Sequence, residues 1–177
     1  MRLFIAIEPG YLSGYFKILQ SQIPGDLAKF SLAKSFHLTL KFLGEVDESW
    51  LEAIKTSLNK VSFTPFTAFL TGIGFFPNEK NIKVIWLGFD QSEKIIELQK
   101  NIDKSLRHIL KPDNRFHPHI TLARVKLIKD REMFLAKISQ INTEEKQLEA
   151  VSFRLIKSTL TPEGLVYEVL AEFPQDL

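Results

Sequence analysis

The chain has 177 residues, and 45% of them are hydrophobic, so it can bury the core of one compact domain or of two small lobes packed together. It contains no cysteine, which excludes a disulfide framework and thiolate chemistry. Twenty-three Lys and Arg against 21 Asp and Glu leave a net charge of +2, which neither requires a nucleic-acid partner nor excludes a local basic cleft.

Two strands and one helix are predicted before residue 45. The segment RLFIAI (2–7) has the composition of a buried strand. Residues 11–23 carry apolar side chains at helical spacing, and this helix is expected to end at Pro24-Gly25. The segment FHLTLKFLG (36–44) alternates like a strand and stops at Gly44.

A helix and a hairpin are predicted next. Asp47 is a residue of the N-cap type, and the apolar stripe that follows it as far as Val61 predicts an amphipathic helix. The segments FTAFLTGIGFF (66–76) and KVIWLGF (83–89) are typical of two strands, joined by a turn around Pro77-Asn78.

The same order of elements follows in the second half. Ser92 is a candidate N-cap for a helix with one apolar stripe, which is expected to stop before Pro112. The segment RFHPHITLARV (115–125) is the next predicted strand, and a short helix is expected around 130–141. A last hairpin joins 148–160 to 165–173 across Thr161-Pro162-Glu163-Gly164.

Helix, strand, helix and hairpin therefore occur twice, in approximately residues 10–90 and 92–173. We predict an α+β fold in which residues 1–177 form a single two-lobed domain. The two lobes are expected to be pseudo-symmetric, each with an antiparallel sheet and flanking helices. The active site is expected in the cleft between them.

Two of the predicted strands carry the same pattern of histidine, apolar residue, threonine and leucine. It reads HLTL at 37–40 and HITL at 119–122, an offset of 82 residues. Because strand side chains alternate between faces, the His and Thr of each copy share one face, and the apolar residues share the other. One histidine in a strand is most often structural, but two copies at matching places of a repeat favour a shared chemical role.

These motifs resemble those of the two-histidine phosphoesterase superfamily. Their flanks, LTLKFLGEV and PHITLARV, are similar to those of its RNA 2′,3′-cyclic phosphodiesterase branch, also called 2′-5′ RNA ligase. The resemblance covers essentially the whole chain, since the opening LFIAI strand and the element order match as well. It implies a bilobal α+β fold with a central cleft, no metal or other cofactor, and opening of an RNA 2′,3′-cyclic phosphate to a 2′-phosphate. Ligation would be the same reaction in reverse.

Opening a cyclic phosphodiester with water requires a base that accepts a proton from water and an acid that protonates the leaving oxygen. The two groups lie on opposite sides of phosphorus, because attack and departure are roughly in line. Histidine suits both roles, since its unperturbed pKa of about 6.5 allows one neutral and one protonated ring near neutral pH. The pattern by itself leaves both assignments open. The resemblance implies that His37 is the proton donor to the 3′-oxygen and His119 is the proton acceptor that activates water.

Three residues are predicted to bind the substrate phosphate. The hydroxyls of Thr39 and Thr121 can donate hydrogen bonds to the non-bridging oxygens, although threonine is also simply a good strand former. The resemblance implies that Arg124 contacts the phosphate. Simple alternation places Arg124 on the face opposite His119, so a bulge or a strand end must redirect it.

Other residues near the motifs have less specific interpretations. Pro118 interrupts the strand between the two histidines of the second motif, which favours a structural or rim role for His117. His108, late in a predicted helix, suits the C-terminal end of the helix dipole. Lys41 continues the His37 face, so both contact with RNA phosphates and simple solvation stay open. Further candidates for a basic rim or a base-stacking surface bracket the motifs: Lys34, Lys111, Arg115, Lys126, Phe42 and Phe116.

Three other functions fit part of the pattern. A metal site at His117-x-His119 lacks a carboxylate at a neighbouring ligand position. A module that binds RNA ends without turnover would be better served by arginine than by two His-Thr pairs. An enzyme acting on the cyclic phosphate of a small nucleotide or sugar metabolite differs only in the shape of its pocket.

We therefore expect RNA with 2′,3′-cyclic phosphate or 2′-phosphate ends, or related nucleotides, as the binding partner. No metal, no other cofactor and no obligate protein partner are expected, and the protein is expected to be a monomer. The sequence has no apolar run of 18 residues. The opening segment MRLFIAIEP is too short for a signal peptide, and a charged residue, Glu8, follows too early. A cytoplasmic location without membrane contact is the corresponding expectation.

Overall fold

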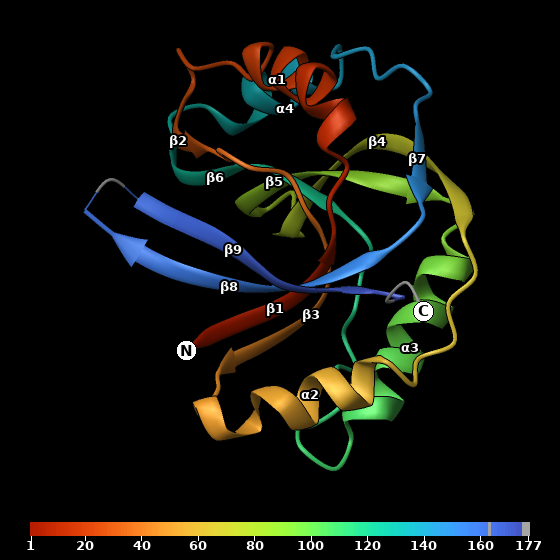
Figure 1. Ribbon diagram of the computed structural model, residues 1–177. Coiled ribbons are helices and arrows are strands. Elements are labelled where there is room, and N and C mark those ends of the chain that lie inside the picture. The colour runs from red at the N-terminus through yellow and green to blue at the C-terminus, as the bar shows by residue number, and fades with distance from the viewer. Residues whose placement is uncertain (163, 175–177) are drawn as a thin grey trace.

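The computed structural model describes residues 1–162 and 164–174, and within them nine strands form one sheet in which all pairs are antiparallel. The sheet is strongly curled, with α1 and α4 at one end of the molecule and α2 and α3 at the other (Figure 1). The α+β class predicted from the sequence is confirmed. No helix among the described residues is long and apolar enough to cross a membrane.

The first half of the chain supplies five strands and two α-helices. The 3₁₀ turn Gly10–Leu12 precedes the first helix, and Glu48–Trp50 precedes the second. The elements are β1 (Arg2–Ile7), α1 (Ser13–Ser21), β2 (Ala28–Leu32), β3 (Leu38–Glu45), α2 (Leu51–Leu58), β4 (Phe66–Asn78) and β5 (Asn81–Asp90).

The second half supplies four strands and two α-helices, again in the order helix, strand, helix and strands. They are α3 (Glu93–Leu106), β6 (Ile120–Ile128), α4 (Arg131–Ile138), β7 (Gln147–Ala150), β8 (Phe153–Thr161) and β9 (Gly164–Phe173).

The ends of several elements show the expected local chemistry. The side chain of Asp47 accepts a hydrogen bond from the Ser49 N–H at 2.9 Å, as an N-cap residue does. Ser92 stands at the N-cap position of α3 but makes no side-chain capping bond. The first hairpin turns two residues later than predicted, because Asn78 Oδ1 accepts from the N–H groups of Lys80 and Asn81 and closes the turn there.

Three strand predictions need correction. β2 was not expected at all; it pairs with β6. The second motif strand begins at Ile120 instead of residue 115, and the predicted strand 148–160 is two strands, β7 and β8. Glu163, in the predicted last turn, lies outside the described residues.

The strand order differs from the prediction of two lobes, each with its own sheet. It runs β7-β4-β5-β6-β3-β1-β8-β9, with β2 also pairing with β6. The hairpin of the first half, β4–β5, therefore pairs with the motif strand of the second half, and β8–β9 joins β1 and the motif strand of the first half. The physical reason is that β6 pairs with β2 and β5 of the first half, and β1 pairs with β8 of the second half. Since β3 pairs with β1 and meets β6 at one residue pair, one continuous sheet forms.

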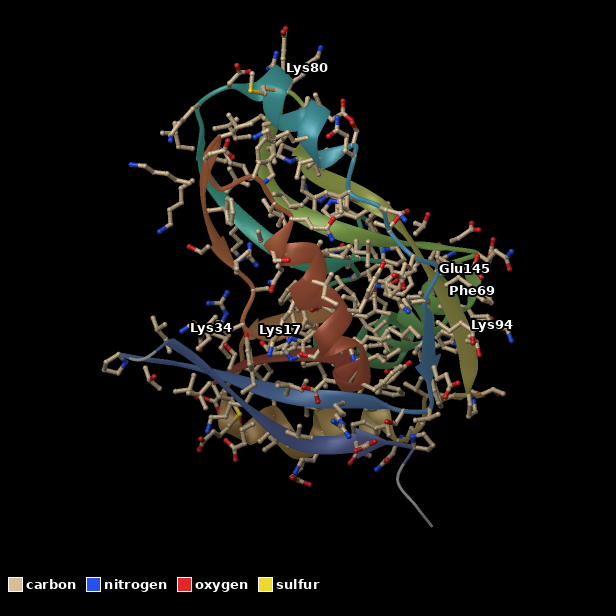
Figure 2. All side chains as sticks on the ribbon, turned by 90° about the horizontal axis from the view of Figure 1, so that it is seen from above. Lys17, Lys34, Phe69, Lys80, Lys94 and Glu145 are labelled. Atoms are coloured by element: carbon tan, nitrogen blue, oxygen red, sulfur yellow. The ribbon has the colours of Figure 1, made fainter. Side chains whose placement is uncertain are left out.

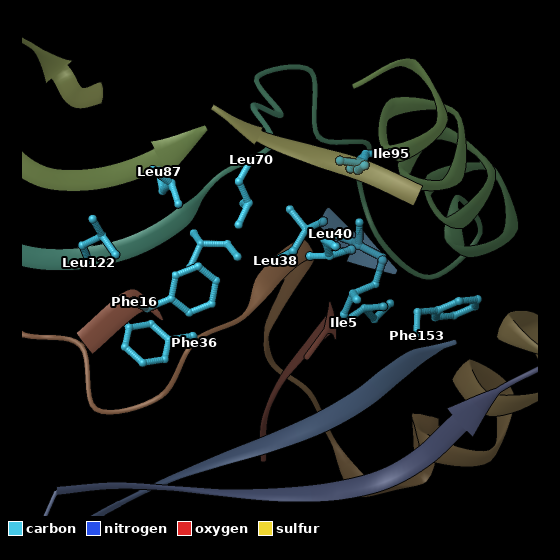
Figure 3. Close-up of a cluster of buried hydrophobic side chains, with 14 of the residues drawn as sticks. Ile5, Phe16, Phe36, Leu38, Leu40, Leu70, Leu87, Ile95, Leu122 and Phe153 are labelled. Carbon is cyan, nitrogen blue, oxygen red and sulfur yellow. The ribbon is translucent and has the colours of Figure 1, made fainter. Parts of the chain in front are cut away.

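A single apolar cluster lies between the helices and one face of this sheet. Both leucines of the first motif and both apolar residues of the second belong to it, and all four are fully buried. Figure 3 shows Leu38, Leu40 and Leu122 in this cluster together with side chains from α1, α3 and β8. Burying a leucine side chain is worth roughly 1.5–3 kcal/mol, so the apolar side of each motif anchors its strand firmly.

Candidate active site

The two motifs meet where β3 and β6 pair through one residue each, Leu38 opposite Ile120. His37 directly precedes the first of these residues, and His119 directly precedes the second. In a regular antiparallel ladder, residues so related are diagonal neighbours on one face, with Cα atoms about 7–8 Å apart. Residues that are 82 positions apart in the chain are thus brought to one place at the centre of the sheet.

A β-bulge in each motif strand follows its threonine. In β3, Thr39 pairs with Ala6 and Lys41 pairs with Ile5, so Leu40 is the extra residue. In β6, Thr121 pairs with Trp86 and Ala123 pairs with Ile85, so Leu122 is the extra residue. The two bulges lie at equivalent positions of the repeat, because 122 − 40 equals the offset of 82.

The bulge at Leu122 decides the orientation of Arg124. Arg124 pairs with Val84, which is two residues from Trp86 on β5, and Trp86 pairs with Thr121. Since alternate residues of β5 share a face, Arg124 and Thr121 lie on the same face of the sheet. Arg124 is exposed there, as a phosphate contact would require.

The bulge at Leu40 has the opposite consequence for Lys41. Lys41 moves to the helix-covered face, where only 4% of the residue is exposed, and its Nζ donates to Asp103 Oδ1. Both sequence interpretations of Lys41, phosphate contact and solvation, are therefore wrong. Phe42 takes the place on the site face that Arg124 has in the other motif, and it is 66% exposed.

The ring of His37 is enclosed by an anion and two aromatic side chains. Its Nε2 lies 3.2 Å from Glu8 Oε1, and its side chain is only 10% exposed. The ring meets Phe4 and Tyr167 edge-on, with centroids 5.3 and 4.9 Å away. A carboxylate only accepts hydrogen bonds, so the His37 Nε2 that faces it carries a proton.

Glu8 is itself held in place by a chain of charged groups. Arg154 Nη1 donates to Glu8 Oε2 at 2.8 Å, and Arg154 Nε donates to Glu172 Oε2 at 3.0 Å. Ser152 Oγ donates to the other oxygen of Glu172. The position of Glu8 beside His37 is therefore fixed. Sequence analysis missed Glu8, because the residues that hold it come from β8 and β9.

The ring of His119 has different surroundings. Its Nδ1 lies 2.7 Å from the carbonyl oxygen of His117, so Nδ1 carries the hydrogen and, in the neutral ring, Nε2 carries the lone pair. Phe76 and Trp86 meet the ring with centroids 4.8 and 6.2 Å away. The Arg124 guanidinium and the His117 imidazole are nearby, and both disfavour a positive charge on the His119 ring.

Burial lowers the pKa of both catalytic candidates below the ordinary histidine value, because it disfavours the charged ring. At His37, the Glu8 carboxylate opposes this effect and raises the pKa. At His119, the hydrogen bond to the His117 carbonyl raises the pKa, whereas Arg124 and His117 lower it. The two imidazoles therefore have electrostatic surroundings of opposite sign.

Trp86 supports the second motif from the neighbouring strand. Its ring centroid lies 5.0 Å from that of Phe76 and 4.8 Å from that of His117. The indole lies over Gly74, which pairs with Trp86 across β4 and β5, and a Cβ at Gly74 would come within 2.2 Å of the indole. The absence of a side chain at Gly74 makes room for this ring.

The remaining predicted residues can now be placed. Thr39 and Thr121 are half-buried and lie on the site face, opposite Ala6 and Trp86. His117 is exposed at the rim and packs against Trp86, in agreement with a structural or rim role. His108 lies just past α3, with Nε2 3.4 Å from Ser57 Oγ.

Sequence analysis did not single out the aromatic residues that pack on the two imidazoles, namely Phe4, Tyr167, Phe76 and Trp86. They lie on strands remote in sequence, and nothing but the pairing brings them to the histidines. Within residues 1–162 and 164–174, no group of three or more His, Asp or Glu side chains is arranged to hold a metal ion.

The curled antiparallel sheet, with two His-Thr strands meeting at its centre, defines an α+β protein of the two-histidine class. Residues 29–160 match the model of the 2′-5′ RNA ligase superfamily. The chain therefore belongs to the 2′-5′ RNA ligase superfamily, which confirms the family predicted from the two motifs.

Curated relatives extend this similarity over nearly the whole chain. The RNA 2′,3′-cyclic phosphodiesterase of Methanocaldococcus jannaschii is 37% identical over 177 residues, covering 98% of this chain and 100% of the relative. The protein of the same name from Archaeoglobus fulgidus is 33% identical, with 98% and 99% covered.

Solved structures share the fold. The crystal structure of TT0787 of Thermus thermophilus has a TM-score of 0.79 and 28% identity, covering 98% of this chain and 97% of the other. Escherichia coli LigT complexed with 3′-AMP has a TM-score of 0.73 and 23% identity over 97% and 95% of the two chains, so that similarity concerns the fold.

Proposed function

We propose that this protein is an RNA 2′,3′-cyclic phosphodiesterase that opens the cyclic phosphate to a 2′-phosphate by acid-base catalysis between two histidines, without a metal ion. The observation that carries the proposal is the pairing of Leu38 with Ile120, which brings His37 and His119 to one place on one sheet. The shared name of the curated relatives supports the choice of substrate.

The surroundings of the two rings support the assignment of their roles. His37 faces the Glu8 carboxylate, which stabilises an imidazolium and suits a proton donor. In His119, the hydrogen bond from Nδ1–H to a carbonyl fixes the tautomer, so the lone pair of the neutral ring is on Nε2. Burial and the nearby Arg124 cation favour that neutral ring, which suits a proton acceptor. In the proposed reaction, His119 takes a proton from water as the oxygen of that water bonds to phosphorus. His37 protonates the 3′-oxygen as its bond to phosphorus breaks.

The proposed phosphate contacts come from both motifs. The hydroxyls of Thr39 and Thr121 donate to the non-bridging oxygens, where negative charge develops in the transition state. Arg124 adds a permanent positive charge on the same face. We place the substrate in a cleft between the strand group of β1, β3, β8 and β9 and the group of β2, β4, β5 and β6. RNA with such an end is the proposed partner, and joining of ends would use the same groups in reverse.

The two bulges make the proposed site asymmetric in a way that orients the nucleoside. Arg124 and Phe42 occupy equivalent positions, one cationic and the other aromatic and largely exposed. We infer that the base stacks on Phe42, on the His37 side, while the phosphate is held from the Arg124 side. Stacking of a base on an aromatic side chain is worth about 1–3 kcal/mol.

The decisive experiment follows an RNA ending in a 2′,3′-cyclic phosphate, with chelator in excess. The wild-type protein is expected to convert it to the 2′-phosphate. His37→Ala and His119→Ala are each expected to lower the rate about 10²–10⁴-fold, the usual contribution of one positioned acid or base.

Thr39→Val and Thr121→Val provide graded controls. Each removes one hydrogen bond to a charged group and is expected to slow the reaction about 10- to 100-fold. Circular dichroism should show that all four variants fold. A 3′-phosphate as product, or wild-type rates in either histidine variant, would contradict the proposal.

A further inference from the structure

Three cations follow one face of α3 and its C-terminal end. Lys100, Lys104 and Arg107 are spaced by four and three residues, so they project from the same side of the helix. All three are exposed, and none makes an ion pair with another residue in the part of the chain that the structure describes. We call these three residues the α3 basic ridge.

A hollow lies on each side of the α3 basic ridge. The first, between α2 and α3, has a volume of about 740 Å³ and adds Lys60 and the polar side chains of Ser105 and Asn101 to its lining. The second, of about 520 Å³, lies between α3 and the segment 112–116. Lys104 and Arg107 border both hollows, so positive charge extends across the helix from one to the other.

The acidic groups around the ridge do not neutralise it. Asp103 points inward and is paired with Lys41. Glu52, at the edge of the first hollow, is paired with Lys55 at 3.0 Å. Asp113, in the second hollow, accepts a hydrogen bond from the backbone N–H of Arg115, and Glu97 is exposed one turn before Lys100 on α3. Neither makes an ion pair among the described residues, so these two carboxylates face the three cations of the ridge and Lys60.

Stabilisation of the helix C-terminus explains part of this charge. Lysine and arginine in the last turn interact favourably with the helix dipole, but the effect falls off within one turn. Lys100 lies nearly two turns before the end of α3, and Lys60 belongs to the segment after α2. The helix dipole does not explain the two hollows either. Cations that line a concave surface hold an anion better than cations on a convex surface do.

The segment that lines the second hollow leads directly to the proposed active site along the chain. Phe116 lines it and is three residues before His119, and the segment from Pro112 to His119 spans at most about 25 Å even when fully extended. The ridge faces away from the histidines, because α3 packs on the sheet face that buries Lys41. A ligand that reaches both places must therefore be long and must pass around the segment 112–116.

We propose that the α3 basic ridge and its two hollows bind the phosphodiester backbone of the RNA whose end lies in the active site. This inference rests on the proposed function for its choice of RNA. Several cations in a line across two open hollows suit a chain of phosphates, whereas one compact phosphate ligand would need one closed pocket. The site adds affinity for longer RNA without reading its sequence.

The test compares two triple variants that lose the same charge. In the first, Lys100, Lys104 and Arg107 are each changed to Gln. In the control, Lys17, Lys80 and Lys94 are changed to Gln; Figure 2 shows these three side chains dispersed over the molecule. Binding is measured by fluorescence anisotropy with a single-stranded RNA of about 15 nucleotides that ends in a 3′-hydroxyl, so that the measurement does not depend on turnover.

The ridge variant is expected to bind this RNA about tenfold more weakly than the control. The slope of log K against log salt concentration should become shallower by about 2, the value for three lost contacts to a single strand. Hydrolysis of a mononucleotide 2′,3′-cyclic phosphate should be equal in both variants, because that substrate does not reach the ridge.

Equal RNA affinity and equal salt slopes in the two variants would overturn the proposal. So would a matching loss of mononucleotide hydrolysis in the ridge variant, because the substitutions would then be acting through the active site. Failure of the wild-type protein to open any cyclic phosphate would instead refute the proposed function, and the binding comparison would still decide whether the ridge holds RNA.

Discussion

At the scale of single residues, the two imidazoles differ in the charge beside them more than in their burial. Both rings are largely enclosed, and burial lowers the pKa of each. A carboxylate faces His37, with Arg154 behind it, whereas His119 faces Arg124 and His117. The carboxylate favours the protonated form of His37 and the cation favours the neutral form of His119, which is the direction that acid-base catalysis requires.

Replacing Glu8 by Gln tests this difference. The carboxylate raises the pKa of His37, so its loss should lower that pKa further. A proton donor is active below its pKa, so the alkaline limb of the kcat/KM profile should move to lower pH. The measurement is the pH dependence of kcat/KM with a cyclic-phosphate substrate.

Arg124→Gln tests the other histidine and should raise the pKa of His119. Its cation lowers the pKa of His119, so its removal should raise that pKa. A proton acceptor is active above its pKa, so the acidic limb should move to higher pH. If the Glu8 variant moved the acidic limb instead, the roles of the two histidines would be reversed.

At the scale of elements, the bulges and the close contact between β4 and β5 shape the site. An extra residue after each threonine turns Arg124 and Phe42 toward the site and Lys41 into the core. On β4, the absence of a side chain at Gly74 makes room for the Trp86 indole beside the second motif. Departures from regular pairing thus place functional side chains that regular alternation would misplace.

Gly74→Ala should disturb the second motif through Trp86. The added methyl group would come within 2.2 Å of the indole, so the ring must move, at a cost of about 1–3 kcal/mol in the free energy of unfolding. We expect activity to fall as well, because the ring packs against His117. Denaturant unfolding and kcat measure the two effects.

Gly72→Ala is the matched control on the same strand. A Cβ at Gly72 would have no atom within 4 Å, so stability and activity should stay close to the wild-type values. Equal losses in the two alanine variants would show that strand flexibility, and not the position of Trp86, is responsible.

At the scale of the whole molecule, a buried ion pair connects the two halves of the site. Lys41 lies on β3, two residues after Thr39. Its Nζ donates to Asp103 Oδ1 and, at 2.9 Å, to the carbonyl oxygen of Lys111. Asp103 Oδ2 accepts from the backbone N–H of Asp113 at 2.9 Å and from Gln99 at 2.8 Å. The network ties the first motif strand to the segment that leads to His119.

Lys41→Met should leave Asp103 as a buried, uncompensated charge. Such losses cost about 3–5 kcal/mol in the free energy of unfolding, whereas a buried pair replaced by apolar side chains is often neutral. Lys41→Met combined with Asp103→Leu should therefore recover most of the stability measured by denaturant unfolding.

Activity should not recover with stability in the double variant. The carbonyl of Lys111 and the N–H of Asp113 still lack their partners, so the segment before His119 is less firmly held, and kcat should stay reduced. Full recovery of kcat would mean that the network only stabilises the fold. A double variant as unstable as Lys41→Met would contradict the proposed compensation.

The sequence by itself determined the features that depend on neighbouring residues. Alternation and helical spacing predicted most strands and helices, Asp47 was predicted as a cap, and the two His-Thr motifs identified the family. These features are local, because the periodicity of a strand or helix and the bonds of a cap involve residues a few positions apart.

Only the tertiary structure decided which strands pair and in what register. The exchange of hairpins between the halves and the bulges at Leu40 and Leu122 depend on contacts between distant segments. A shift of one residue in register moves a side chain to the other face of the sheet, and no local pattern specifies that shift. For this reason the sequence located His37 and His119, while the pairing supplied Glu8 and Trp86 and turned Arg124 toward the site and Lys41 away from it.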